Sequence, residues 1–144
     1  MDSVPEGFAP HFRKSPVTDP WEPLYSRRVG TVIEIGTRLA AAHCNSRGFV
    51  HGGVIAALAD NAMGLSFNEA RLAALGADAA PTGGAVTVTL SLDFLSTART
   101  GSWLQVCPRV LRAGGATGFV DALVTADGEP IARANAVFRM VERR

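Results

Sequence analysis

The sequence predicts an α+β fold in which one long helix packs against an antiparallel sheet. Three observations lead to this prediction. An apolar stretch from about Gly52 to Leu75 has the length and spacing of a helix. Residues 86–94 alternate between apolar and polar side chains, as in a half-buried strand. Strand-like segments separated by glycine-containing turns fill the rest of the chain. The helix must bury its apolar side against the sheet, which gives a two-layer domain.

The segments before the helix divide into an arm and a strand pair. Five prolines in residues 1–24 disfavour a long regular element there: Pro5, Pro10, Pro16, Pro20 and Pro23. We expect the aromatic residues of this arm to pin it onto a single domain that spans residues 25–144: Phe8, Phe12 and Trp21. Between residues 26 and 42 two short strands are expected, broken near Gly36.

The predicted helix has one clear core stripe and an unusual opposite side. The core stripe consists of Val54, Ile55, Leu58, Ala62 and Leu65. Asp60 lies almost opposite, among uncharged neighbours: Gly53, Ala56, Ala57, Met63, Gly64 and Phe67. A solvent-facing helix side normally carries Lys, Glu or Arg. We therefore expect this side to meet a partner surface, most simply a second copy of the chain, and we expect Gly76 to end the helix.

The second half of the chain is predicted to form an antiparallel meander. After a loop containing Pro81, Gly83 and Gly84, strands are expected at 86–94, 102–112, 116–126 and about 131–141. Glycine-containing turns at 113–115 and 127–130 separate the last three strands. Pro108 cannot donate a ladder hydrogen bond, which suggests an edge or a bulge.

Composition excludes several classes of partner. The chain has 144 residues and a formal net charge of +1 without a basic run, which argues against nucleic acid or an anionic membrane as a partner. No apolar run is long enough to span a bilayer. The two cysteines, Cys44 and Cys107, form neither a disulfide framework nor a metal motif, so no metal is expected. Residues 1–24 lack the features of a secretory signal, and we expect a cytoplasmic protein.

Asp60 is the main candidate for chemistry. It is the only formally charged residue between Arg47 and Glu69, inside a stretch that otherwise resembles a buried helix. Burying a carboxylate is costly unless it is paired or used. Just upstream, His51, Gly52 and Gly53 open the helix, where free backbone N–H groups and a partial positive charge gather. This combination predicts an active site built around a helix start.

These residues resemble a known family. The segment Asn45-Ser46-Arg47-Gly48-Phe49-Val50-His51-Gly52-Gly53, followed by Leu58-Ala59-Asp60, is similar to the N-x-x-G-x-x-H-G-G-x-x-x-x-L-x-D signature of hotdog-fold acyl-CoA thioesterases, most of all the phenylacetate-degradation (PaaI-like) group. The resemblance implies a sheet of five or six strands wrapped around the helix, a homodimer or a dimer of dimers, and hydrolysis of an acyl-CoA thioester. Coenzyme A would then be part of the substrate, and no cofactor is expected.

Each candidate residue has a chemical role and a simpler alternative. We assign the Gly53 N–H as the main oxyanion donor, and the resemblance points to the same residue. Asp60 would be the general base or the nucleophile, which the sequence does not separate. Thr87, on the polar face of its strand, would hold the lytic water, while Asn45 and His51 would orient the carbonyl or the water. Alternatively, His51 caps the helix, Asn45 is a turn residue, Thr87 is an ordinary strand residue and the glycines are a simple junction.

Helix geometry predicts a site shared between two chains. Gly53 and Asp60 are seven residues apart, which places them about 10 Å apart along one helix axis. Both would need to lie roughly 3 Å from the same reacting group. The site should therefore combine Asn45, His51 and Gly53 of one subunit with Asp60 and Thr87 of another, and the resemblance implies the same arrangement.

Substrate contacts are predicted less directly. Arginines at strand ends, Arg99 and Arg112, are candidates for the phosphates of coenzyme A. Gly52, Asn61, Met63 and Phe67 are candidates for the rest of the substrate, whose acyl group would be aryl or medium to long chain. Two other functions remain open: a hydratase or dehydratase on the same fold, and a non-catalytic acyl-CoA-binding protein.

Overall fold

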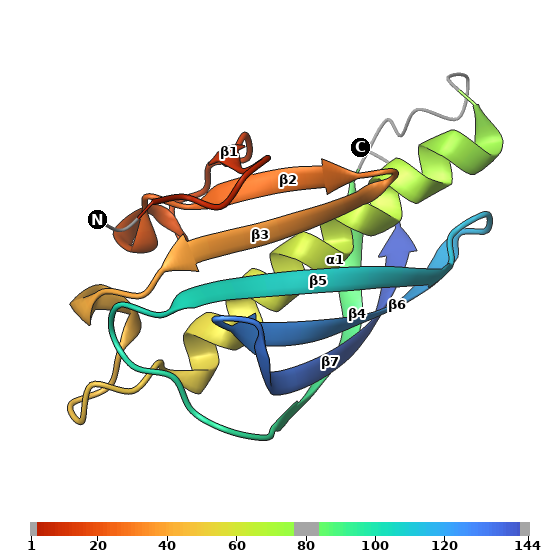
Figure 1. Cartoon of the computed structure of the whole chain (residues 1–144). Coiled ribbons are helices and arrows are strands. Elements are labelled where there is room, and N and C mark those ends of the chain that lie inside the picture. Colours follow the sequence, from red (N-terminus) through yellow and green to blue (C-terminus); the bar gives the residue numbers. More distant parts are fainter. Residues whose placement is uncertain (1–2, 77–83, 142–144) are drawn as a thin grey trace.

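The computed structural model describes residues 3–76 and 84–141. One helix, α1 (Gly52–Leu75), runs diagonally behind a single antiparallel sheet (Figure 1). This arrangement confirms the predicted α+β fold and the predicted bounds of the helix. Gly76 follows α1 with a φ of 83°, a conformation that favours glycine, so the expected helix stop is also confirmed. Pro81 and Gly83 lie outside the described residues.

The sheet has seven strands in the order β1-β2-β3-β5-β6-β7-β4. Their bounds are Ala9–Pro10 for β1, Tyr25–Val29 for β2, Val32–Arg38 for β3, Ala85–Phe94 for β4, Trp103–Arg112 for β5, Thr117–Ala126 for β6 and Glu129–Met140 for β7. Two short 3₁₀ helices, η1 (Asp19–Trp21) and η2 (Ala41–His43), precede α1. The four strands expected in the second half are confirmed, but only β5, β6 and β7 form a meander, because β4 lies beside β7 at the edge of the sheet and not beside β5. The two-residue β1 adds one strand to the expected five or six.

The expected break at Gly36 was wrong. The chain turns between β2 and β3 at Gly30, and Gly36 lies inside β3, where it pairs with Gln105. A Cβ on Gly36 would lie 2.3 Å from the Trp103 ring. The glycine therefore allows a tryptophan to cross the strand closely, which is a common reason for glycine inside a strand.

The N-terminal arm is joined to the sheet through β1, which pairs with β2. Phe8 packs edge-on against Trp103, with ring centroids 5.2 Å apart, and Trp21 packs against the core. Phe12 is half exposed and packs on the side chain of Arg28 in β2. All three aromatic residues therefore contact the body as expected, Phe12 at its surface.

Pro108 lies in the part of β5 that is no longer paired with β3. The pairing of β3 with β5 ends at Ile35 and Val106, so the position of Pro108 has no partner on the β3 side. On the other side it pairs with Ala122 of β6. The prediction of a local edge is confirmed, and the missing N–H of Pro108 disturbs no ladder.

Strand β4 differs from the predicted half-buried strand. It forms one edge of the sheet, paired only with β7, and most of its residues are exposed. A bulge at Val88 separates the pair Thr87–Phe138 from the pair Thr89–Val137. Because of this extra residue, Thr87 shares the face of the buried Phe138, whereas Thr89 faces the other way. The expected single polar face of this strand is therefore wrong at Thr87.

Two helix residues lie in the core instead of on the expected partner side. Met63 and Phe67 are both 0% exposed, and Phe67 stacks on Phe138 with ring centroids 6.0 Å apart. The sheet curves around α1 and covers more of its circumference than a single stripe. Both side chains are enclosed in the single chain, and their assignment as substrate contacts stays a prediction.

Candidate active site

Asp60 and Thr87 form the centre of the candidate site. The Thr87 hydroxyl donates a hydrogen bond of 2.6 Å to Asp60 Oδ1, and Asp60 is partly exposed on α1. The bond orients the carboxylate and leaves its second oxygen without a protein donor among the described residues. Asp60 and Thr87 lie together within one chain, as expected if a single subunit supplies both residues to the site.

The bulge in β4 makes this contact possible. Four side chains of β4 face the helix, as shown by their pairing with buried residues of β7: Thr87, Leu90, Leu92 and Phe94. At the other end of this row, a Cβ on Gly52 would lie 3.1 Å from the Phe94 ring. Strand β4 therefore runs along α1 from Asp60 back to the start of the helix.

At the start of α1, the N-cap residue occupies one of the backbone N–H groups. His51 is the N-cap, and its Nδ1 accepts a hydrogen bond of 2.8 Å from the Gly53 N–H. The expectation that this N–H is free for a substrate oxygen is wrong for the present conformation. Helix starts leave N–H groups unpaired, and the nearest acceptor side chain takes one. Both His51 and Gly53 are exposed, so the bond faces solvent.

Asn45 organises the loop that leads into the helix. Its Oδ1 accepts hydrogen bonds from the N–H groups of Arg47 at 2.9 Å and Phe49 at 3.2 Å. This is the turn role that the sequence left open. Only its amide NH₂ group remains for a substrate or a water.

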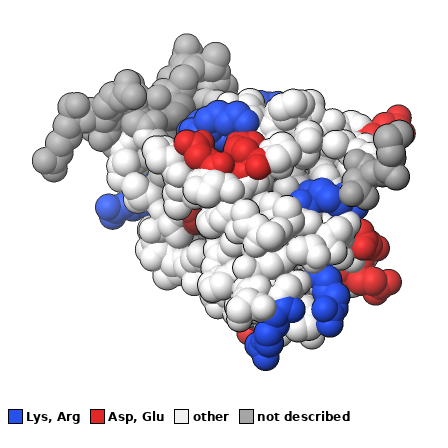
Figure 2. Space-filling model, turned by 90° about the vertical axis from the view of Figure 1, so that its left-hand side faces the viewer, with Lys and Arg blue, Asp and Glu red and all other residues white. Residues whose placement is uncertain are grey.

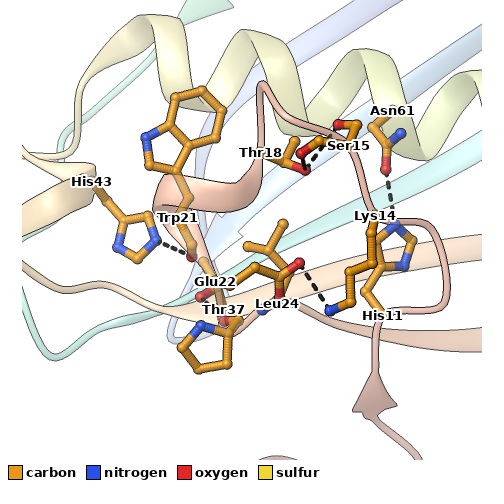
Figure 3. A network of polar contacts seen from close by, with 11 residues as sticks. His11, Lys14, Ser15, Thr18, Trp21, Glu22, Leu24, Thr37, His43 and Asn61 are labelled. Atoms are coloured by element: carbon orange, nitrogen blue, oxygen red, sulfur yellow. Dashed lines mark hydrogen bonds and ion pairs between the residues drawn. The ribbon is translucent and has the colours of Figure 1, made fainter.

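Asn61 contacts the arm of its own chain, and its predicted contact with a substrate or a partner helix stays a prediction. His11 Nε2 and Asn61 Oδ1 are 2.9 Å apart, and both residues are shown in Figure 3. His43 also holds the arm, because its Nε2 donates to the Trp21 carbonyl at 2.9 Å while its Nδ1 accepts from Ala40 N–H. Neither histidine has a sequence signal for this role, because His11 lies in the proline-rich arm and His43 lies in the short η2 segment, both without periodicity.

The two candidate arginines lie at opposite ends of β5. Arg99 stacks on the Phe49 ring at 4.4 Å and lines a hollow of about 520 Å³ near the start of α1. Arg112 lines a second hollow of about 570 Å³ at the β5–β6 hairpin. Ten strand residues span about 33 Å. In a single chain the two guanidinium groups cannot bind the same phosphate.

At the end of the molecule where α1 begins, much of the surface is uncharged. Figure 2 shows charged side chains in small mixed groups around this broad uncharged area. Among the described residues, no three acidic, histidine or cysteine side chains are placed to hold a metal ion, and no helix is long and apolar enough to cross a membrane.

Neither cysteine is suited to nucleophilic catalysis. Burial raises the pKa of the Cys44 thiol above its ordinary value. Burial, together with the nearby Glu34, raises the pKa of Cys107 to about 11. Thiols act as nucleophiles in the thiolate form, so Asp60 remains the candidate.

Comparison with known proteins identifies the family. Residues 47–132, which include the helix start, Asp60 and Thr87, match the family model of the thioesterase superfamily. A Pseudomonas aeruginosa protein that carries an esterase name is 36% identical over 141 residues, covering 97% of this chain and 99% of that protein. The chain belongs to the thioesterase superfamily. Its members hydrolyse thioesters, and this chain is a thioester hydrolase.

Solved structures of similar proteins support the fold of this thioesterase. A Streptococcus mutans protein bound to acetyl-CoA aligns with a TM-score of 0.63 at 26% identity, covering 78% of this chain and 82% of that chain. The Escherichia coli PaaI protein from the phenylacetic acid degradation operon aligns with a TM-score of 0.65 at 20% identity, covering 77% and 73%. The predicted hotdog fold and PaaI-like resemblance are thereby confirmed. The catalytic roles of individual residues stay predictions.

Proposed function

We propose that this thioesterase hydrolyses acyl-CoA thioesters to a carboxylic acid and free coenzyme A, with Asp60 as the general base or nucleophile. The observation that carries the proposal is the Thr87–Asp60 hydrogen bond on a partly exposed helix face. Similarity to a protein that was crystallised with acetyl-CoA supports the substrate class. Coenzyme A is part of the substrate, and the chemistry needs no further cofactor.

The Asp60 carboxylate can act in either of two ways. Thr87 donates to Oδ1, so Oδ2 can take a proton from a water or attack the thioester carbon itself. The lone pairs of the Thr87 hydroxyl can at the same time accept a hydrogen bond from the lytic water. Both routes require a fixed carboxylate, and this hydrogen bond holds it in one orientation.

The start of α1 would stabilise the oxyanion after a local exchange of partners. The substrate carbonyl replaces His51 Nδ1 as the acceptor of the Gly53 N–H. Breaking the solvent-facing cap costs about 1 kcal/mol, and the bond to a developing oxyanion is stronger than the one it replaces. The released His51 ring, with the Asn45 amide, can then orient the carbonyl or the water. Glycine at Gly52 and Gly53 keeps the approach open.

The site would be completed by a second copy of the chain. Gly53 and Asp60 are separated by about 10 Å along the helix of one chain. The copy is expected to add at β4, a sheet edge that pairs with no further strand among the described residues. Large apolar residues in and just after β4 are exposed there: Val86, Val88, Leu90, Phe94 and Leu95. A dimer, or a dimer of such dimers, would place Gly53 of one subunit against Asp60 and Thr87 of its partner.

Coenzyme A would contact different arginines of the two subunits. Arg99 lies near the helix start, and Arg112 lies about one strand length away. The two arginines could therefore bind separate phosphate groups, or they could belong to sites formed by separate chains. Arg99 has no ion-pair partner among residues 3–76 and 84–141, so its charge is available. The acyl group would lie between β4 and α1, where aryl and medium- or long-chain groups both match the apolar lining.

An assay of thiol release from a panel of acyl-CoA substrates tests the proposal. Wild-type protein should release free thiol, and Asp60→Asn should lower kcat by roughly 10²–10⁴-fold, because the amide neither accepts the proton nor attacks. Asp93→Asn is the matched control: this carboxylate lies on the opposite face of β4, bonded to Arg133, and its loss should leave kcat unchanged.

Two results would contradict the proposal. Full activity in Asp60→Asn would remove the carboxylate from the mechanism. A folded wild-type protein that releases no thiol from any acyl-CoA would rule out the substrate class.

A further inference from the structure

The arm holds a buried histidine against the catalytic helix. His11 is 2% exposed, although it belongs to a segment that has only two residues in a strand. Its Nε2 lies 2.9 Å from Asn61 Oδ1, and Asn61 directly follows Asp60 on α1 (Figure 3). Its backbone N–H donates to Leu24 carbonyl at 2.9 Å. The arm is therefore fixed to the helix one residue from the proposed catalytic carboxylate.

The hydrogen bond and the surroundings of Nδ1 define the protonation state of the His11 ring. A carbonyl oxygen only accepts, so Nε2 carries a hydrogen, and the protonation state of the ring is decided at Nδ1. Nδ1 is buried and has no hydrogen-bond partner among the described residues. A second proton would create a charged donor at Nδ1 without an acceptor, which is costly in a buried place. The docked arm therefore requires a neutral ring.

The charges around His11 do not compensate for protonation. The charged groups that act on His11 are Glu22, Lys14 and Arg13 of the arm. From the elements packed against the arm, Arg28 of β2 lies over the neighbouring Phe12, and Asp60 precedes the bonded Asn61 on α1. Glu22 favours the protonated ring, but it is already paired with Lys14 at 3.0 Å. Arg13 and Lys14 oppose protonation, and Arg28 stacks on Phe12 next in the chain. Burial has the largest effect and lowers the pKa of His11 below its ordinary value.

We propose that His11 is a pH-sensitive latch that docks the N-terminal arm onto α1 beside Asp60. Release of the arm would uncover Asn61 and the helix face next to the site. This inference concerns the arm alone and holds whatever substrate the enzyme takes.

Linkage sets the direction of the pH dependence. The docked state lowers the pKa of His11, whereas the undocked ring titrates at about 6.5. The docked state therefore binds fewer protons, and docking is complete above about pH 6.5. It weakens as the pH falls below that value, by up to about tenfold per pH unit, until the lowered pKa is reached.

Hydrogen-exchange mass spectrometry at pH 7.5 and 5.5 tests the latch. Protection factors of arm amides in residues 8–24, corrected for intrinsic exchange rates, should fall by up to about tenfold at pH 5.5 in the wild type. His11→Gln keeps an amide N–H that can donate to Asn61 but does not titrate, so its arm should stay protected at both values. His43→Gln is the control for the other histidine that bonds the arm, and it should keep the wild-type pH response.

An equal pH response in the wild type and His11→Gln would overturn the proposal. A second measurement needs no variant: NMR titration of the His11 ring should give a pKa below the ordinary value. Titration at the ordinary value, with the arm protected throughout, would also overturn it.

Discussion

At the scale of single residues, the central feature is a carboxylate held by a hydroxyl. Thr87 reaches Asp60 because one extra residue, Val88, turns it toward the helix. Bulges often redirect a side chain next to an active site, and this one places a polar group on a face that is otherwise apolar. The interaction is specific to one position of the strand.

This geometry predicts the effect of Thr87→Val. The variant keeps the shape of the side chain but loses the hydrogen bond to Asp60, so the carboxylate is no longer oriented. We expect kcat/KM for acyl-CoA hydrolysis to fall roughly 10- to 100-fold, the effect of losing a hydrogen bond to a charged group. Thr89→Val, on the opposite face, is the control and should retain wild-type kinetics. Equal kinetics for both variants would assign Thr87 a purely structural role.

At the scale of elements, glycines determine how closely the sheet approaches other groups. A Cβ on Gly118 of β6 would lie 2.2 Å from two ring atoms of Phe67, which itself stacks on Phe138. The helix and the sheet can pack at this distance only because position 118 has no side chain. The same principle applies to Gly36 beneath Trp103.

We therefore expect Gly118→Ala to destabilise the fold. The Phe67 ring is fully buried and has no free space to move into, so the added methyl group should cost about 1–3 kcal/mol. Differential scanning calorimetry should show a Tm lower by several degrees. Gly114→Ala in the neighbouring hairpin meets no atom within 4 Å and should leave the Tm nearly unchanged. An unchanged Tm in Gly118→Ala would show that the helix can shift away from the sheet.

At the scale of the whole molecule, the sheet edge formed by β4 is not paired with a further strand among the described residues. Strand β4 has ten residues and an apolar exposed surface, and a soluble protein normally protects such an edge with charges or with another chain. The helix face that carries Asp60 is likewise small and uncharged, with Ala56, Ala57 and Gly64 around it. Both features fit one partner, a second copy that completes the site.

Val88→Lys should separate the subunits and remove activity together. A lysine in the middle of the edge would place an unpaired charge inside the proposed interface. Light scattering after size-exclusion chromatography should show a monomer in place of a dimer or tetramer, and thiol release should be lost. Val29→Lys, equally exposed at the end of β2, should change neither property. A monomeric variant with full activity would place the whole site within one chain.

The sequence alone determined most elements of this protein and pointed to a candidate site. Helix α1 and the last four strands were predicted nearly to the residue, because apolar periodicity and turn glycines are local properties. The motif from Asn45 to Asp60 indicated the family for the same reason, since its residues lie within one loop and one helix.

Only the tertiary structure decided which side chains meet. His11 and Asn61 are 50 positions apart, and Thr87 and Asp60 are 27 apart. Neither contact has a local signal, because each depends on where the arm docks and on a bulge that shifts the register of an edge strand. The burial of Met63 and Phe67 likewise depends on how far the sheet curves around α1. Periodicity specifies the face of each element, while sheet curvature and register determine what covers that face.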